Sequence, residues 1–560
     1  MTPAISIGKQ DFASLRENHY FYVDKTDFIR QWWESGDDIT LITRPRRFGK
    51  TLNMSMLNCF FSRQYAEKGT IFEGLSIWKQ EKYRRLQGTY PVIFLSFADV
   101  KQNNYQDAVQ KIKNIIVDAY RQHRYLEQEE CFTQNEKQQM LEITEKMSDV
   151  TAQDALKNLS SYLNLLYGKK VLIFLDEYDT PMQEAYIHGY WDEFVGFMRS
   201  LFNATFKTNP YLERAVMTGI TRISKESVFS DLNNLTVITT TSDAYADCFG
   251  FTEEEVFQSL DQFGMPEKKD LVKQWYDGFC FGTHRDIYNP WSITNYLKEK
   301  KLRPYWAATS SNGLISKLLQ LASVNMKEEL EKLINRQQIV VNFDEQIIFG
   351  QLEQDESAVW SLLVASGYLK VEEIEYRGLT LEPWYSLSIT NLETVSMFSN
   401  MFKSWFAAAS ANYNEFIKAL LNGDVKAMNL YMNDIALATF SNFDAGKHAS
   451  ERSQPERFYH GFVLGLLVEV RDLYEVRSNR ESGYGRYDVI LIPRNLDRDA
   501  MILEFKVKET EEKTLQETVQ KALAQIEIKK YDAELKERGI PKERIRHYGF
   551  AFEGKKVLIG

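Results

Sequence analysis

The chain has 560 residues, of which 44% are hydrophobic and 26% are charged, and its formal net charge is −10. This length exceeds what one hydrophobic core usually organises, so we expect two to four folded domains. The acidic balance argues against a protein that coats nucleic acid non-specifically, because neutralising phosphates requires clustered Lys and Arg; local basic patches are still compatible with it.

The cysteines are widely spaced and form no CxxC pair, and the chain has only seven histidines. A structural zinc site is therefore not expected. The N-terminus lacks a basic stretch followed by an apolar run, and no apolar segment reaches membrane-spanning length. We therefore expect a cytoplasmic protein with no membrane partner.

Short apolar strands alternate with helical stretches in the first part of the chain. Residues 39–43 predict a strand and residues 52–61 a helix, and the alternation continues with strands at 92–97, 171–175 and 214–221 and helices at 105–126 and 152–167. Strands that alternate with helices indicate a parallel α/β sheet. We assign this domain to residues 1–250.

The remaining sequence predicts four further segments. Residues 251–337 are mainly helical and are interpreted as a helical lid, and residues 338–395 mix short elements in a winged-helix-like piece. A helical connector at 396–450 ends in turn-forming residues, and a compact α/β domain follows at 451–560. Its predicted elements are a helix at 455–474, strands at 474–477, 487–492 and 501–507, a helix at 511–536, and strands at 548–552 and 557–559.

A candidate phosphate-binding loop joins the first predicted strand to its helix. It offers a lysine for phosphates, a hydroxyl for magnesium and a helix N-terminus that faces the anion. The G-x-x-x-x-G-K-[ST] pattern is incomplete, because Arg44 occupies the position of the first glycine and Pro45 has no N–H. We therefore expect ATP in a cradle that differs from the standard one, formed by Arg47, Phe48, Gly49, Lys50 and Thr51.

The predicted strand at 171–175 ends in two acidic residues, a pattern that resembles Walker B. Asp176 would hold Mg²⁺ together with Thr51, and Glu177 would orient or deprotonate the water that attacks ATP. Taken alone, this could be a solvated acidic turn. The combination with the loop favours an ATP site.

With these motifs, the N-terminal half resembles the AAA-ATPase-like family that is often found ahead of a nuclease domain. The resemblance runs from about residue 5 through the predicted lid, and it rests on Phe21-Tyr-Val-Asp-Lys-Thr, Arg44-Pro-Arg-Arg-Phe-Gly-Lys-Thr, Leu175-Asp-Glu-Tyr-Asp, Thr218-Gly-Ile-Thr-Arg, Trp275-Tyr-Asp-Gly and Tyr288-Asn-Pro-Trp-Ser. It implies ATP binding, with Thr218 or Thr221 as a γ-phosphate sensor and Arg222 as a phosphate contact. Ordinary strand-end hydroxyls and a solvated arginine are the alternative.

Two apolar strands near the C-terminus carry charged residues where a buried strand should not. Glu504 and Lys506 share one face of their strand because side chains alternate with a period of two. If the preceding strand pairs with it, Asp488 approaches Glu504, and two carboxylates meet one lysine. Asp488 and Glu504 would be Mg²⁺ ligands and Lys506 would orient or polarise a water, as phosphodiester hydrolysis requires. An exposed charge pair at a sheet edge is the alternative.

The final domain resembles the PD-(D/E)XK nuclease superfamily from about residue 454 to the C-terminus. The motifs are Tyr459-His-Gly, Gly483-Tyr-Gly-Arg-Tyr-Asp, Glu504-Phe-Lys, Ala524-Gln-Ile and Lys530-Tyr. The resemblance assigns Asp488 and Glu504 as metal ligands and Lys506 as the catalytic lysine, with Gln525 lining the site. Either Glu481 or Glu469 would be a supporting acid.

The sequence therefore predicts an ATP-binding protein whose C-terminal domain hydrolyses nucleic acid with Mg²⁺. We expect DNA as the substrate more than RNA, and we expect the bound nucleotide to regulate cleavage. The alternative is a nucleotide-sensing protein that binds nucleic acid without cleaving it, which the missing first glycine of the loop favours.

Overall fold

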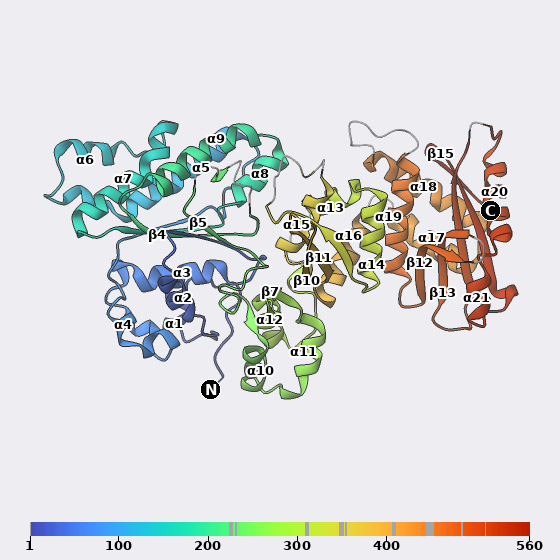
Figure 1. The fold of residues 1–560 in the computed structure, drawn as a ribbon, viewed down its shortest axis with the longest axis horizontal. Coiled ribbons are helices and arrows are strands. Elements are labelled where there is room, and N and C mark those ends of the chain that lie inside the picture. Colours follow the sequence, from blue (N-terminus) through green and yellow to red (C-terminus); the bar gives the residue numbers. More distant parts are fainter. Residues whose placement is uncertain are drawn as a thin grey trace. The chain divides into compact units, whose positions relative to one another are not determined.

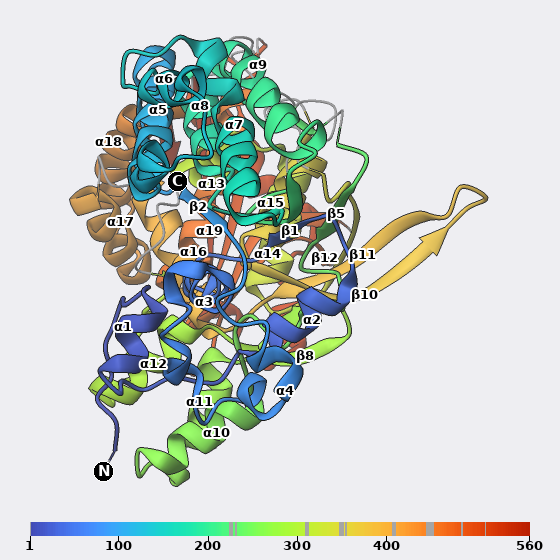
Figure 2. The same cartoon turned by 90° about the vertical axis from the view of Figure 1, so that its left-hand side faces the viewer.

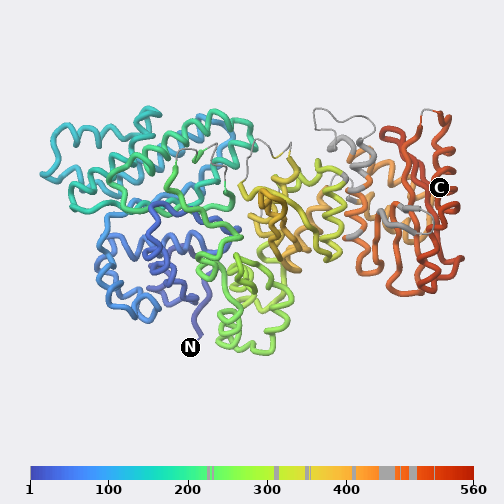
Figure 3. Tube along the Cα trace, viewed as in Figure 1, coloured from blue at the N-terminus to red at the C-terminus, as the bar shows by residue number. Residues whose placement is uncertain are grey.

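The computed structural model describes residues 2–222, 228–229, 232–307, 313–346, 352, 355–405, 410–443, 453–482, 485–509 and 511–560. The chain forms two compact units, Met1–Ser311 with Val340–Thr394 and Asn312–Ile339 with Val395–Gly560. It therefore passes from one unit to the other after residues 311, 339 and 394 (Figure 3). The first unit contains the predicted ATPase-like domain, residues 1–250, and the second contains the predicted C-terminal domain, residues 451–560.

A five-stranded parallel sheet is the centre of the first unit. Its strand order is β2 (Val92–Ser96), β3 (Val171–Asp176), β4 (Leu212–Gly219), β1 (Ile39–Thr43) and β5 (Leu235–Ile238). Parallel sheets need cover on both faces, which explains the continuous burial of β1 and β3. Helix α3 (Lys50–Phe61) covers one face, and α5 (Tyr105–Gln122) and α7 (Asp149–Tyr167) cover the other (Figures 1 and 2). The predicted parallel α/β fold is thus confirmed.

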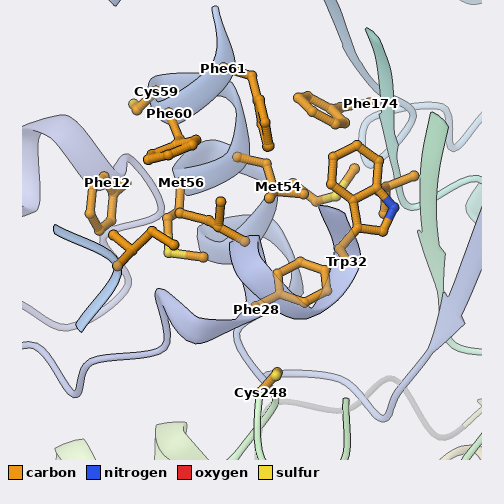
Figure 4. Packing of buried hydrophobic residues seen from close by; sticks show 14 of the residues in the cluster. Phe12, Phe28, Trp32, Met54, Met56, Cys59, Phe60, Phe61, Phe174 and Cys248 are labelled. Atoms are coloured by element: carbon orange, nitrogen blue, oxygen red, sulfur yellow. The ribbon is translucent and has the colours of Figure 1, made fainter. Parts of the chain in front are cut away.

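The core beneath α3 is rich in aromatic residues (Figure 4). Phe12 comes from α1 (Phe12–Glu17), Trp32 from α2 (Asp27–Ser35), and Met54 and Phe61 from α3. All four are fully buried, and the rings of Trp32 and Phe61 meet edge to face at 5.5 Å. This packing holds α3, and therefore the loop at its N-terminus, against the sheet.

The first unit contains further helices. They are α4 (Glu81–Arg84), α6 (Gln134–Leu141), α8 (Thr180–His188), α9 (Trp191–Phe202), α10 (Glu253–Gln262), α11 (Lys269–Tyr276), α12 (Pro290–Glu299) and α15 (Glu356–Ala365).

Two small sheets accompany them. The region predicted as a mainly helical lid also contains β6 (Phe251–Thr252), β8 (His284–Tyr288) and β7 (Phe279–Phe281) in one sheet. These strands of two to five residues are too short to show a period of two in sequence. Within the predicted winged-helix-like piece, α15 precedes the hairpin of β10 (Leu369–Arg377) and β11 (Glu382–Ile389), and β9 (Ile339–Asn342) pairs with β11 (Figure 2).

The second unit contains a mixed five-stranded sheet with helices. Its strands lie in the order β12 (Tyr474–Ser482), β13 (Gly485–Pro493), β14 (Ala500–Val507), β15 (Ile545–Glu553) and β16 (Lys556–Ile559), with only β14 and β15 parallel. The helices are α13 (Gly313–Leu321), α14 (Val324–Ile334), α16 (Leu392–Trp405), α17 (Ser410–Asn422), α18 (Val425–Phe443), α19 (Ser453–Glu469), α20 (Leu515–Lys529) and α21 (Ala533–Glu537). The order from α19 to β15 confirms the predicted αβββαβ arrangement.

Two long predicted helices are interrupted where the backbone turns left-handed. The helical connector predicted at 396–450 breaks at Gly423, whose φ is +73°, between α17 and α18. The helix predicted at 511–536 ends at Lys529, because Lys530 adopts a φ of +52° as its C-cap. Among the described residues, no helix is long and apolar enough to cross a bilayer.

Candidate nucleotide and metal sites

The loop after β1 opens onto a cavity of the first unit. Gly49, with a φ of +80°, is the N-cap of α3, so the helix begins at Lys50 and its N-terminus faces the cavity. The cavity measures about 660 Å³, a size common for ligand pockets, and Lys50, Thr51 and Glu177 line it. A cavity of this volume is large enough to hold a nucleotide.

The side chain of Lys50 is buried within the loop itself. Its Nζ donates to the backbone oxygens of Arg44 at 2.9 Å and Pro45 at 2.8 Å. Burial lowers the pKa of Lys50, while the charges of Glu177 and Asp176 oppose that change. The ammonium is therefore held by loop carbonyls and must exchange them to reach a phosphate.

Arg44, at the position of the missing first glycine, points into the core and not toward the cavity. Its Nη1 donates to the carbonyls of Thr43 at 2.9 Å and Thr239 at 2.6 Å, and its Nη2 donates to Ala244 at 3.2 Å. The guanidinium lies 4.4 Å from the ring centre of Phe281, and burial lowers the pKa of Arg44 to about 9. The arginine thus fastens the start of the loop to the chain that follows β5.

Asp176 joins the loop to the sheet. Its carboxylate accepts hydrogen bonds from the hydroxyls of Thr51 at 2.8 Å and Thr218 at 2.5 Å. Burial raises the pKa of Asp176, and these two hydrogen bonds oppose the rise. Because β3 and β4 are parallel neighbours and β1 follows next, their carboxyl ends bring these three residues to one edge.

Glu177 lies beside them in an unusual backbone conformation. Its φ is +52°, which is rare for a residue with a side chain and is often found at functional sites. The carboxylate lines the cavity and accepts a hydrogen bond of 3.1 Å from the hydroxyl of Thr180. Thr221 lies elsewhere: its hydroxyl donates to Asp179 at 2.7 Å, so it holds the turn after β3.

The other two loop residues differ in orientation. Phe48 is 1% exposed and its ring packs 4.7 Å from that of Phe279, so only its backbone can approach a ligand. Arg47 has a φ of +68°, and its guanidinium lies 4.4 Å from the ring centre of Trp291. Both Arg47 and Trp291 line the cavity, and no pattern in the sequence indicates that Trp291 lies there rather than in a core.

In the second unit, β13 and β14 bring Asp488 next to Glu504. The strands are antiparallel with Val489 opposite Leu503, and Asp488 Oδ2 accepts a hydrogen bond of 2.7 Å from the N–H of Phe505. Glu504 is 2% exposed, and its Oε2 has no hydrogen-bond partner among the described residues. Burial raises the pKa of Glu504 to about 8, and the charge of Asp488 adds to the rise.

Gln525 on α20 connects the two charged residues of β14. Its Oε1 accepts a hydrogen bond of 2.7 Å from Lys506 Nζ, and its Nε2 donates to Glu504 Oε1 and, at 3.0 Å, to the hydroxyl of Tyr531. Lys506 Nζ lies 4.0 Å from Glu504 Oε1. The structure therefore brings Asp488, Glu504, Lys506 and Gln525 together.

This arrangement suits a divalent cation. Asp488 and Glu504 are neighbouring carboxylates, and the charge of Asp488 adds to the rise that burial causes in the pKa of Glu504; a buried oxygen of Glu504 without a hydrogen-bond partner among the described residues is available as a ligand atom. Oxygen donors of this kind are those that Mg²⁺ prefers. The residues present thus fit such an ion.

Of the two proposed supporting acids, only Glu469 has a side chain among the described residues. Glu469 pairs with Lys403 at 3.0 Å and ends α19, ten residues or about 15 Å along the helix from Tyr459, which donates to the backbone oxygen of Asp488 at 2.8 Å. Glu469 is therefore not near the carboxylate pair. The side chain of Glu481 lies outside the described residues.

Comparison with known proteins agrees with the family resemblances of both the N-terminal and the C-terminal parts of the chain. Residues 6–229 match the AAA-ATPase-like family, described as a predicted AAA-ATPase, and residues 454–560 match the PD-(D/E)XK nuclease superfamily. The chain thus contains an AAA-ATPase-like domain followed by a PD-(D/E)XK nuclease superfamily domain.

A relative with the same extent is known from Azotobacter chroococcum mcd 1. It is described as an uncharacterized protein in the vnfD 5' region and is 25% identical over 550 residues, which cover 96% of this chain and 94% of the relative. The similarity therefore spans both domains and the residues between them.

Proposed function

We propose that the C-terminal domain is a Mg²⁺-dependent nuclease that hydrolyses phosphodiester bonds of nucleic acid, with DNA favoured over RNA as the substrate, and that ATP bound to the N-terminal domain regulates it. The observation that carries this proposal is that β13 and β14 bring Asp488, Glu504 and Lys506 together, with a buried oxygen of Glu504, Oε2, that has no hydrogen-bond partner among the described residues.

Each residue has a separate task in the proposed reaction. Asp488 and Glu504 would hold Mg²⁺, which neutralises charge on the scissile phosphate and lowers the pKa of a bound water. Lys506 would orient that water or the phosphate, with Gln525 fixing the direction of its ammonium through the 2.7 Å hydrogen bond.

The test uses the purified full chain with Mg²⁺ or Mn²⁺ on linear, circular and single-stranded DNA and on RNA, with and without ATP. Asp488→Ala and Lys506→Ala should each lower cleavage by at least about 100-fold. Lys508→Ala is the matched control, since Lys508 follows the same strand but pairs with Glu553. Cleavage that persists in the Asp488 and Lys506 variants would come from a contaminant or another site and would reject the proposal.

For the N-terminal domain we propose Mg²⁺–ATP binding by residues 47–51, with Thr51 and Asp176 at the metal and Glu177 activating the water. The support is the shared cavity of Lys50, Thr51 and Glu177 and the hydrogen bond of 2.8 Å between Thr51 and Asp176. Glu177→Gln should keep ATP binding and stop turnover.

A second candidate is a nucleotide sensor that binds ATP without hydrolysing it and whose C-terminal fold binds nucleic acid without cleaving it. It is favoured by the loop, in which Lys50 is held by the carbonyls of Arg44 and Pro45. ATP turnover that Glu177→Gln abolishes would exclude this candidate. Tight ATP binding with no turnover would support it.

A further inference from the structure

Helix α14 is part of the unit that contains the metal-site residues, although it lies more than 100 residues before them in the chain. Its N-cap is Ser323, whose hydroxyl accepts a hydrogen bond from the N–H of Met326. Met326, Leu330 and Leu333 are at most 2% exposed and form one buried stripe. This stripe fixes the helix firmly within the unit.

The same helix sends a carboxylate to the edge of the sheet. Glu331 Oε1 accepts a hydrogen bond of 3.0 Å from the N–H of Ser478, and Glu331 Oε2 accepts one from the hydroxyl of Ser478. Both residues are at least nine-tenths buried. Because β12 is the outer strand of the sheet, its outward N–H groups have no neighbouring strand, and Glu331 satisfies one of them.

This contact lies one strand away from Asp488, because β12 pairs directly with β13. Ser478 is opposite Val489, the residue that follows Asp488 on β13. The hydroxyl of Tyr459, which donates to the backbone oxygen of Asp488, is within electrostatic range of Glu331 as well as of Asp488 and Glu504. Glu331 therefore contacts β12, and β12 pairs directly with β13, the strand that carries Asp488.

We propose that Glu331 is a positioning residue of the metal site: its carboxylate holds β12 at Ser478 and so sets the place of Asp488 on β13. This rests on the proposed metal-dependent function of the C-terminal domain. It makes helix α14, which is outside residues 454–560, a component that the metal site needs.

The experiment measures Mn²⁺ binding to the full chain by calorimetry, and the Mn²⁺ concentration that half-saturates cleavage. Glu331→Ala and Ser478→Ala should each weaken Mn²⁺ binding by about tenfold, as loss of residues that orient metal ligands commonly does. The double variant should bind no more weakly than the weaker single variant, because both changes act on the same pair of residues. Glu329→Ala is the control, since Glu329 is on the same helix but pairs with Lys332 at 2.6 Å.

Thermal unfolding separates positioning from simple loss of folding. A variant that keeps the wild-type Tm with EDTA and still needs more Mn²⁺ supports the proposal. If Glu331→Ala fails to fold, Ser478→Ala decides, because it removes the hydroxyl and keeps the backbone N–H. Wild-type metal dependence in a folded Glu331 or Ser478 variant overturns the positioning role. Absence of Mn²⁺ binding by the wild-type chain overturns the proposed function itself.

Discussion

The hydroxyl of Thr51 donates a hydrogen bond of 2.8 Å to the carboxylate of Asp176, across 125 positions of sequence. Thr51 is in the first turn of α3 and Asp176 ends β3, so the parallel sheet alone brings them together. A hydroxyl and a carboxylate at this distance can both reach one Mg²⁺, and neither needs a large movement to do so.

Replacement of Thr51 should therefore affect the metal-dependent part of ATP binding. We expect Thr51→Ala to weaken Mg²⁺–ATP binding by about tenfold, because one oxygen ligand is lost. ATP binding in EDTA should change little, which makes the same protein its own control. Fluorescence titration with a labelled ATP measures both. Equal losses with and without Mg²⁺ would mean that Thr51 acts on loop structure and not on the metal.

Arg44 should be needed for the stability of the protein. Replacing it with the glycine of the standard phosphate-binding loop should therefore not strengthen ATP binding. Arg44→Gly leaves the buried carbonyls of Thr43, Thr239 and Ala244 without donors, and we expect the free energy of unfolding to fall by about 3 kcal/mol or more. Thermal and denaturant unfolding measure this change. Arg85→Gly is the control, since the Arg85 side chain is 79% exposed. A stable Arg44→Gly protein with tighter ATP binding would show that the arginine is dispensable.

Gln525 should matter through orientation. Gln525→Leu removes the bridge between Lys506 and Glu504 while keeping most of the side-chain volume, and we expect cleavage to fall by about 10- to 100-fold with little change in Tm. Cleavage rates and thermal unfolding are compared with Gln520→Leu, because Gln520 is exposed on the same helix. If both variants lose equal activity, the effect is a general one of the helix surface.

The two candidate sites were largely predictable because each depends on local periodicity. An alternating strand places Glu504 and Lys506 on one face whatever surrounds it, and a strand followed by Gly49 and a helix defines a loop. The direction of Arg44 was not predictable, since its hydrogen bonds reach residues about 200 positions away. Nothing in the sequence near position 44 indicates that contact.

The contribution of α14 was hidden for a similar reason. The sequence predicts helices between residues 251 and 337, and their pattern is interpreted as one lid. In the structure, Asn312–Ile339 belongs to the unit of the C-terminal domain. An amphipathic pattern shows that a helix buries one face but not which partner covers it. The contact of Glu331 with Ser478 therefore emerges only from the tertiary structure.

Glu504 should make the metal-free protein less stable as pH rises. An unfolded glutamate loses its proton near pH 4.5, whereas burial and then Asp488 keep Glu504 protonated to about pH 8. Between these values the folded state holds one more proton than the unfolded state, so the free energy of unfolding falls by up to about 1.4 kcal/mol per pH unit. Thermal unfolding in EDTA at pH 5.5 and 7.5 measures the slope, and Glu504→Gln should reduce it. An unchanged slope would contradict the raised pKa.

The same group predicts that metal binding releases a proton. At pH 7 the raised pKa of Glu504 keeps it mostly protonated, but a metal ligand must be a carboxylate, so binding Mn²⁺ should release about one proton per ion. At pH 9 the carboxylate is already ionised and the release should nearly vanish, and affinity should rise with pH only up to about the pKa. Calorimetry in HEPES and Tris, which differ in ionisation enthalpy, counts the protons. Equal binding enthalpies in both buffers at pH 7 would show that Glu504 is already charged, and the burial that we assign to its carboxylate would then not control the site.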